Sequence, residues 1–342
     1  RSNCVTGVQT CALPICWFLL ARMYLNAQTW INENKYQEAY AYAVKVIADG
    51  HYPLASDYRE IFLADNNTCK EIIWPLVQDG LRAQSSAGTN FYVKAFVNGP
   101  MDELYKTGVG SRGWGNVRAK VSLVDAFDAD DVMFDGNDTW GNNKKDKRAQ
   151  FMTALPNQVK DTWDVNMDMT STFTCGYGYI KWRNVTKEDE LCPSGDAYTS
   201  IDFPLFRTAD AYLMAAEAIL RGANGTQSEA LGYVNEVRTR AYMSGKYAKN
   251  GVRSDVSGEI TANELNLDFL LVERQKELAS ELTRRTDLIR FGKYTKGNNW
   301  DWKNGVRLGA DVDDKYNLFP IPESELTNNP TLVQNDGYKV IK

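Results

Sequence analysis

Histidine is nearly absent from this chain of 342 residues, in which His51 is the only example. Catalytic triads and metal sites that use two or more imidazoles are therefore excluded. His51 itself follows a glycine at the predicted end of a helix, where we expect a turn residue rather than a catalyst. No two cysteines have the CxxC spacing, so the sequence indicates neither a zinc site nor a disulfide framework.

Long apolar runs and clusters of basic residues are also lacking. No stretch approaches the roughly 20 apolar residues that a membrane-spanning helix requires. The net charge is −5, without any concentration of lysine and arginine. This argues against a nucleic-acid partner, because phosphate binding needs such a concentration. The chain does contain 12% aromatic and 43% hydrophobic residues, which is enough for a sizeable core.

The first residues differ from the rest of the chain. The string VTGVQTCALPI at residues 5–15 resembles the in-frame translation of a sequencing adaptor, and it lacks the apolar segment of a secretory signal. We therefore predict that residues 1–16 are an artefact. The natural N-terminus, with any signal peptide or lipid-attachment cysteine, would then be missing. Outside this segment the cysteines are Cys69, Cys175 and Cys192.

Apolar periodicity predicts two pairs of helices, at residues 17–26 and 36–48 and at residues 207–220 and 228–241. Alanines recur on their inner faces, where small side chains allow two helices to approach closely. Gly50 supplies an end signal for the second helix. Such hairpins are typical of tetratricopeptide repeats, although the strict repeat signature is incomplete here.

The middle of the chain, residues 66–200, has a different character. It is rich in glycine, asparagine, aspartate, tryptophan and tyrosine. Short apolar runs at residues 71–77 and 178–182 predict brief strands between loops. Long loops in a compact protein are usually functional or disordered, and the tryptophans argue against disorder.

A dense set of charges occupies residues 271–294, where the spacing of apolar residues predicts one helix. Opposite charges three or four residues apart predict ion pairs along it. The predicted semi-buried network contains Arg284, Arg285 and Arg290 beside Glu277, Glu281 and Asp287. A solvated helix with weak surface pairs is the alternative.

Five stretches follow one another along the chain. They are LLARMYLNA with YQEAYAYAVKVIADGHYPL, DYREIFLADN and EIIW, then DKRA, then FPLFRTADAYLMAAEAIL with EALGYVNEVRTRA, then LLVERQKELASELTRRTDLIRFGKY, and finally LFPIPESEL with NNPTLVQNDGY. In this order they resemble the SusD/RagB family, the surface glycan-binding lipoproteins of Bacteroidetes. Together they span nearly all of residues 17–338. The chain has Glu281–Leu282 where many relatives have Glu-Gly, and the family's N-terminal portion is absent.

The resemblance implies a mainly α fold, in which tetratricopeptide-type helical hairpins carry a loop-rich region with short β-strands. Residues 17–342 would be the C-terminal portion of a single SusD-like domain. Its parts would be a hairpin at 17–50, a binding region at 66–200, a helical part at 206–294 and a tail at 295–342.

The implied function is non-catalytic capture of an oligosaccharide at the bacterial outer-membrane surface. The glycan would pass to a SusC-like TonB-dependent transporter. A lipid anchor that this chain lacks would hold the protein at the membrane, and no cofactor is expected.

Carbohydrate binding requires flat aromatic faces for sugar rings and polar side chains for their hydroxyl groups. The loop-rich region supplies both kinds of side chain. We predict that the ligand-binding residues are Trp114, Trp140, Tyr92, Trp163, Arg112, Asn116 and Asn142. The alternative for each aromatic residue is that it fills a gap beneath a loop.

Two other chemistries are open at this point. The aspartates Asp125, Asp128, Asp130, Asp131 and Asp135 offer oxygen ligands for calcium, but they lack the glycine and final glutamate of an EF-hand, so a solvated acidic turn is expected. No pair of carboxylates stands out for glycoside hydrolysis, so we do not expect an enzyme. The alternative function is a helical-repeat module that binds a protein or peptide, including peptide capture by a SusD-like protein.

Overall fold

The computed structural model describes residues 2–82, 84, 86–99, 102–103, 106–132, 141, 143–153, 177–243, 256–297, 306 and 309–339. The fold is mainly helical, as predicted. The chain forms two compact units, which we call unit 1 (residues 1–281) and unit 2 (residues 282–342). Among the described residues we find no helix that combines the length and the apolar character of a membrane span. The artefact at residues 1–16 and the single domain over residues 17–342 stay predictions.

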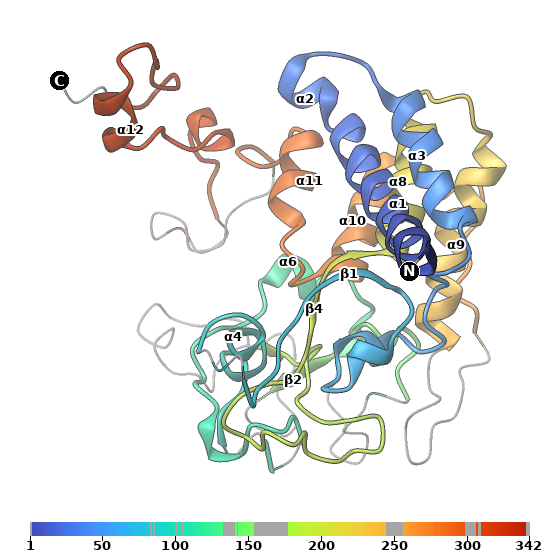
Figure 1. Ribbon diagram of the computed structural model, residues 1–342, viewed down its shortest axis with the longest axis vertical. Helices are drawn as coiled ribbons and strands as arrows, with labels where there is room; N and C mark the ends of the chain where they lie inside the picture. Colours follow the sequence, from blue (N-terminus) through green and yellow to red (C-terminus); the bar gives the residue numbers. More distant parts are fainter. Residues whose placement is uncertain are drawn as a thin grey trace. The chain divides into compact units, whose positions relative to one another are not determined.

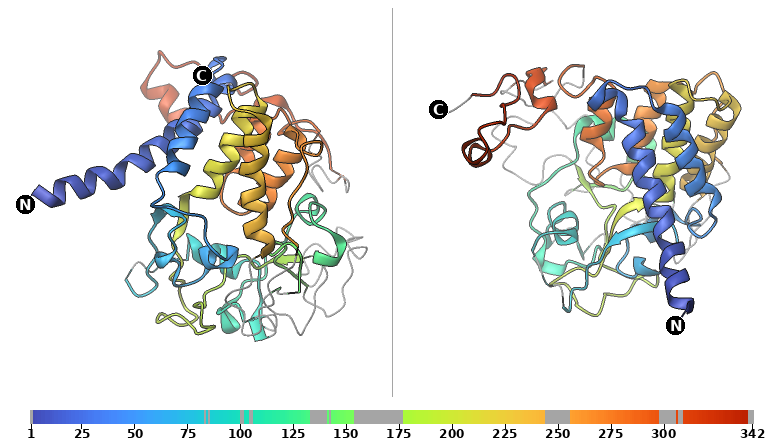
Figure 2. Two further views of the ribbon diagram at one scale, coloured as in Figure 1. Left: turned by 90° about the vertical axis from the view of Figure 1, so that its right-hand side faces the viewer. Right: turned by 45° about the horizontal axis from the view of Figure 1, so that its top comes forward.

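Two helical hairpins form one half of unit 1 (Figure 1). The first contains α1 (Ser2–Leu25), the short α2 (Ala27–Ile31) and α3 (Tyr36–Ala48), and the second contains α8 (Thr208–Leu220) and α9 (Gln227–Met243). Helix α3 packs on both α1 and α8, so the hairpins lie side by side (Figure 2). The alanines predicted to face inward are fully buried, namely Ala39, Ala43, Ala209, Ala216, Ala230 and Ala241.

The other half of unit 1 contains loops, short helices and two small antiparallel sheets (Figure 1). Strand β1 (Ile72–Leu76) pairs with β4 (Phe203–Arg207), and β2 (Phe151–Thr153) pairs with β3 (Tyr177–Tyr179). The short helical segments are η1 (Tyr58–Phe62), η2 (Asn66–Thr68), α4 (Thr89–Lys94), η3 (Gly110–Arg112), α6 (Val121–Val124) and α7 (Ala129–Val132).

Strand β4 corrects the prediction that helical structure returns at Phe206. Phe206 is paired with Trp74 of β1, and α8 begins only at Thr208. The pairing is favoured because the Phe206 ring then packs against the rings of Trp74 and Phe18, with centroid separations of 5.2 and 4.5 Å.

The core of the loop-rich half is built around Trp182, of which only 1% is exposed. The rings of Phe62, Tyr92 and Phe203 surround it, with centroids 4.9, 5.4 and 5.6 Å from the indole. Stacked and edge-on aromatic contacts of this kind add to the free energy of burial. This cluster fixes helix α4 and strand β4 beneath the loops.

The predicted helix over residues 271–294 is interrupted, which corrects the sequence interpretation. The structure contains α10 (Leu267–Leu278) in unit 1 and α11 (Arg284–Arg290) in unit 2. Ser280 and Leu282 between them have φ of 61°, in the left-handed region, and the Leu282 side chain is 73% exposed.

Buried cations explain why α10 stops. The carbonyl oxygen of Glu277 accepts hydrogen bonds from Lys181 Nζ and Arg207 Nη2 at 3.2 and 2.8 Å, and the carbonyl of Ala279 accepts from Lys181 Nζ at 2.8 Å. A continuous helix would use these carbonyls for its own backbone. Ending the helix frees them and turns the Glu281 carboxylate toward Arg207, whose Nε donates to it at 2.6 Å.

The ionic network exists, and it is more deeply buried than the sequence predicted. Each carboxylate of the network, which we call the ionic core, is at most 7% exposed. Glu277 accepts from Arg148, Arg207 and Arg240. The other pairs are Glu71 with Arg207 and Arg240, Glu273 with Arg148 and Arg238, Glu281 with Arg207 and Lys181, and Asp146 with Arg148.

The partners found in the ionic core differ from those that helical spacing predicted. They come from β4, α9 and the loops around Arg148 and Lys181, which lie far from α10 in the sequence. Of the predicted pairs, Asp287 and Arg290 meet within α11 at 2.7 Å. Pairs three or four residues apart are visible in a sequence, whereas these long-range pairs depend on the tertiary fold.

Candidate functional site

The best candidate for a binding site lies where a glycine-rich loop crosses the end of helix α4. The last carbonyl groups of a helix have no partner within the helix. Here the carbonyl of Lys94, the last residue of α4, accepts from the backbone N–H of Trp114 at 2.8 Å, and the carbonyl of Val97, beyond the helix, accepts from that of Gly115 at 2.9 Å. Gly113 is required at the crossing, because a Cβ there would lie 2.4 Å from the Val97 carbonyl oxygen.

The opposite wall is the loop at residues 194–200, which is tied to α4 by buried polar groups. The backbone N–H of Thr199 donates to Oδ1 of Asn90 at 3.1 Å, and the hydroxyl groups of Thr199 and Thr89 lie 2.9 Å apart. Thr89, Asn90 and Thr199 are each at most 3% exposed. Buried hydrogen bonds of this kind hold a loop in one conformation, because breaking them would leave polar groups unsatisfied.

Between these walls lies an open pocket of about 450 Å³, which we call the loop pocket. It is within the size range of ligand sites, roughly 300–1,000 Å³. Its lining is mostly polar and consists of Ser86, Asn90, Lys94, Ser111, Arg112, Gly113, Trp114, Ala197 and Tyr198.

Trp114 gives the loop pocket an aromatic edge. Its side chain is 41% exposed, and the neighbouring Phe91 is 42% exposed, with 6.3 Å between the two ring centroids. Exposed aromatic rings that contact each other are a suitable surface for the C–H face of a sugar ring.

Two cations and one carboxylate determine the charge of the loop pocket. Nε of Arg112 donates to Oδ1 of Asp196 at 3.0 Å, and both side chains are more than one third exposed. The Lys94 ammonium donates to the carbonyl of Ala197. Burial lowers the pKa of Lys94, and the nearby Arg112 guanidinium lowers this pKa further.

The structure brings two of the predicted ligand-binding residues, Trp114 and Arg112, together in the loop pocket. Asn116 is exposed on the same loop but does not line the pocket. Tyr92 lies on α4 with its ring stacked on Trp182, so the structure does not bring it to the loop pocket. Trp140, Asn142 and Trp163 lie outside the described residues.

Sequence reasoning missed Lys94, Asn90, Tyr198 and Phe91. Lys94 did leave a signal, since it is the one charged residue within the apolar run FYVKAFV at residues 91–97. A lysine in such a run is either paired or placed beside a site, because charged side chains are rarely buried alone.

The aspartates between Asp125 and Asp135 were expected to form a solvated turn, and one of them, Asp131, is instead buried. Asp131 is 2% exposed, and its two carboxylate oxygens accept the backbone N–H of Lys145 and Asp146 at 2.7 and 3.1 Å. Asp125, Asp128 and Asp130 are exposed, and Asp135 lies outside the described residues. The described residues contain no group of three acidic, histidine or cysteine side chains arranged to hold a metal ion.

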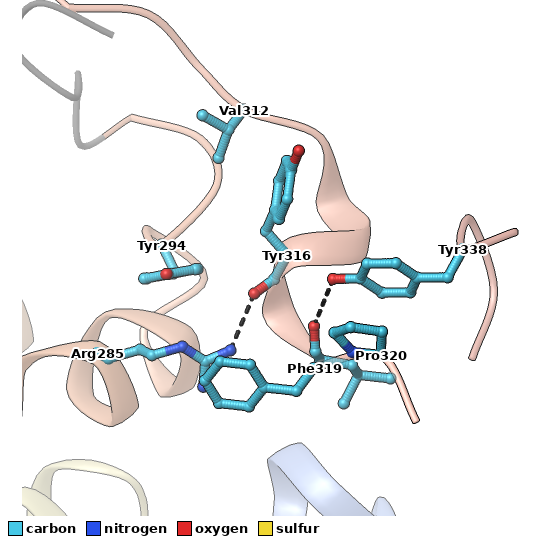
Figure 3. A pocket seen from close by; sticks show the side chains of 8 residues that line it. Arg285, Tyr294, Val312, Tyr316, Phe319, Pro320 and Tyr338 are labelled. Carbon is cyan, nitrogen blue, oxygen red and sulfur yellow. Dashed lines mark hydrogen bonds between the residues drawn. The ribbon is translucent and has the colours of Figure 1, made fainter. Parts of the chain in front are cut away.

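Unit 2 contains a second, more apolar pocket of about 380 Å³. Figure 3 shows the Arg285 guanidinium beside the Phe319 ring, 4.2 Å from its centroid. Nη2 of Arg285 donates to the carbonyl groups of Tyr316 and Asn317 at 2.9 and 3.0 Å. The cation therefore holds the wall of this pocket together, and the loop pocket is the better candidate for recognition of a polar ligand.

Comparison with known proteins gives consistent results. The chain matches the sequence model of the SusD family over residues 70–338. The starch-binding protein SusD of Bacteroides thetaiotaomicron is 33% identical over 353 residues, which cover 94% of this chain and 60% of that protein. SusD-like protein P25 of Formosa agariphila is 25% identical, with 93% of this chain and 58% of that protein covered.

Solved structures show the same fold. Surface glycan-binding protein A of Bacteroides thetaiotaomicron, in complex with laminarihexaose, superposes with a TM-score of 0.60 at 22% identity, covering 92% of this chain and 62% of that one. For surface glycan-binding protein A of Bacteroides uniformis the TM-score is 0.61 at 23% identity, with 93% and 60% covered. The chain spans about 60% of the length of these relatives.

Proposed function

The chain belongs to the SusD family, and from this membership and the loop pocket we propose that it captures an oligosaccharide without cleaving it. Capture would take place at the bacterial outer-membrane surface. The observation that carries the proposal is the exposed Trp114 at the edge of a polar pocket. An aromatic face beside hydrogen-bonding groups is the arrangement that recognises a sugar ring and its hydroxyl groups.

The names of the relatives support carbohydrate as the ligand class. One is a starch-binding protein, and another, a surface glycan-binding protein, was solved in complex with laminarihexaose. Both match more than nine tenths of this chain. Family membership also supports a SusC-like TonB-dependent transporter as the partner that receives the glycan, and a lipid anchor as the attachment to the membrane.

Binding without cleavage is supported by the side chains of the loop pocket. Glycoside hydrolysis canonically uses two carboxyl groups that flank the bond to be broken. Among the described residues that line the pocket, none carries a carboxyl group. The nearby Asp196 is paired with Arg112.

A peptide-binding helical repeat receives no support from the helices. The tyrosines that would contact such a peptide are engaged between helices. Tyr24 stacks on Tyr42 with a centroid separation of 5.7 Å, and the Tyr40 hydroxyl donates to Glu229 at 3.2 Å.

Affinity electrophoresis and calorimetry with a panel of oligosaccharides test the proposal. We expect at least one glycan to bind, to remain uncleaved on chromatography, and to bind at least tenfold more weakly to Trp114→Ala with an unchanged Tm. Trp30→Ala is the matched control, because this tryptophan is 45% exposed on α2, outside the pocket lining. If no glycan binds, or if Trp114→Ala binds like the unaltered protein, the proposal is wrong.

A further inference from the structure

Lys94 places a buried charge in the wall of the loop pocket. Only 5% of this residue is exposed. Among the described residues its ammonium has one hydrogen-bond acceptor, the carbonyl of Ala197, although an ammonium carries three donors. Burying a charge is costly unless it is paired, and one carbonyl together with the Tyr198 ring, whose centroid is 6.0 Å from the ammonium, compensates poorly. The wall of the pocket therefore contains a cation with unused donors.

Arg112 adds a second cation at the same pocket. Its Nε is used by Asp196, while its two terminal nitrogens have no hydrogen-bond partner among the described residues. Its side chain is 58% exposed, so these donors are accessible to a ligand. Asp196 is the single carboxylate that the described residues pair with these cations, which leaves the group with one net positive charge.

We infer that the loop pocket binds an acidic sugar, whose carboxylate or sulfate group is held by Lys94 and Arg112 while its ring contacts Trp114. This inference rests on the proposed glycan capture and narrows it to anionic glycans. A guanidinium with two free nitrogens matches the two oxygens of such an anion, and a lysine adds a point charge. Ser86 and Ser111 supply neutral groups for the remaining hydroxyls.

Pairs of oligosaccharides that differ only in charge test the inference. A galacturonan oligosaccharide is compared with its methyl ester, which is neutral, and a sulfated dextran oligosaccharide with plain dextran. Calorimetry at 50 mM and 300 mM salt measures each Kd. We expect one acidic member to bind at least tenfold more tightly than its neutral partner, and this preference to shrink at high salt because screening weakens ionic contacts. The carboxylate and sulfate arms identify which anion is preferred.

Two variants test whether Lys94 and Arg112 bind the anionic group. Lys94→Gln keeps a donor for the Ala197 carbonyl but removes the charge, and Arg112→Gln alters a side chain that is exposed and so outside the core. Each should weaken binding of the acidic partner more than binding of the neutral one, so that most of the preference for the acidic partner is lost. Lys35→Gln, at the N-cap of α3, is the control and should keep the full preference.

The outcomes separate this inference from the proposed function. If neutral glycans bind through Trp114 and no acidic partner binds more tightly, the inference is wrong and glycan capture stands. An acidic preference that survives in both Lys94→Gln and Arg112→Gln also overturns the inference. If no glycan of either kind binds, both proposals are wrong.

Discussion

Two buried lysines of unit 1 have very different surroundings. In the ionic core, the Lys181 ammonium contacts the Glu281 carboxylate and two backbone carbonyl groups. In the loop pocket, the Lys94 ammonium contacts the carbonyl of Ala197 and no carboxylate among the described residues. Burial lowers the pKa of both lysines, that of Lys181 to about 8.

A buried lysine can therefore serve either of two purposes, depending on how many of its hydrogen-bond donors have acceptors within the protein. In the ionic core, every donor that reaches a carboxylate fixes the position of a helix or a strand. In the loop pocket, the donors that remain unused are available to a ligand. Removing charges or space from one region, and measuring the effect on stability and on binding, tests this distinction.

The largest effect is expected when a carboxylate is removed from the ionic core. Glu277 is fully buried and contacts three guanidinium groups. Burial alone would raise its pKa, but Arg240, Arg207 and Arg148 outweigh burial and hold the pKa well below its usual range. Glu277→Ala should lower the free energy of unfolding by about 3–5 kcal/mol, because it leaves buried cations uncompensated. Urea unfolding followed by circular dichroism measures this loss.

A matched control is Glu33→Ala. Glu33 is a surface glutamate, 56% exposed, that pairs with Lys35 at 3.5 Å. Exposed pairs contribute at most about 1 kcal/mol. Equal losses in the two variants would show that the ionic core does not hold the fold together.

The second largest effect is expected at low pH, which should lower the free energy of unfolding. Burial alone would raise the pKa of Asp210, but Arg274 and Arg22 outweigh it and lower the pKa to about 2. A carboxyl group whose folded pKa lies below its unfolded value stabilises the protein above the unfolded pKa, near 4, and this contribution is lost as the pH falls through the folded pKa. Asp210 alone should account for about 2 kcal/mol between pH 5 and pH 2.

The measurement is the urea midpoint as a function of pH. It should be level above pH 5 and fall steadily below pH 4.5. A midpoint that stays level down to pH 3 would mean that these carboxylates carry no folding energy. Asp210→Asn should flatten the acid part of the curve.

Local patterns predicted the hairpins well, because their information is contained in short windows. Ala39 and Ala43 lie four residues apart and are both fully buried, as helical periodicity requires. The break after α10 was not predictable in this way. Ser280 and Leu282 adopt left-handed conformations because Lys181 and Arg207, about 100 and 70 residues away in the sequence, need the carbonyl groups of that turn.

The candidate site was predictable only in part, for a related reason. Trp114 and Arg112 lie in a loop rich in glycine, and exposed aromatic and basic residues in such loops indicate binding. The sequence around Tyr92 is also rich in glycine, polar and aromatic residues, so it gave the same indication of binding. Tyr92, however, lies on the face of α4 that packs against Trp182, whereas Asn90 and Lys94 lie on the face that lines the loop pocket. Which face of a six-residue helix meets the core depends on distant residues such as Phe203.

A smaller effect is expected when space is removed beneath Trp114. In Gly113→Ala, the added Cβ would lie 2.4 Å from the Val97 carbonyl oxygen, so the loop must shift. Such overpacking costs about 1–2 kcal/mol. Glycan affinity should fall about tenfold while circular dichroism shows an intact helical scaffold. Gly232→Ala in α9 is the control, since its Cβ meets nothing within 4 Å and alanine favours a helix. If both variants bind glycan equally well, the Trp114 loop does not form the site.

The smallest effect is expected in unit 2, where the described residues give the Arg285 guanidinium no carboxylate partner. Arg285 donates to two carbonyl groups and lies 4.2 Å from the centroid of the Phe319 ring. Exposed contacts of this kind contribute about 1 kcal/mol. Arg285→Ala should therefore speed hydrogen exchange of the amides in α11 (Arg284–Arg290) and η7 (Asp314–Asn317) by roughly fivefold, with unchanged glycan binding. Arg285→Lys should recover little of the protection, because an ammonium cannot stack on the ring with a planar face. A loss of glycan affinity in Arg285→Ala would show that the glycan binds in unit 2 rather than in the loop pocket. Unused hydrogen-bond donors on a buried cation would then not mark the binding site.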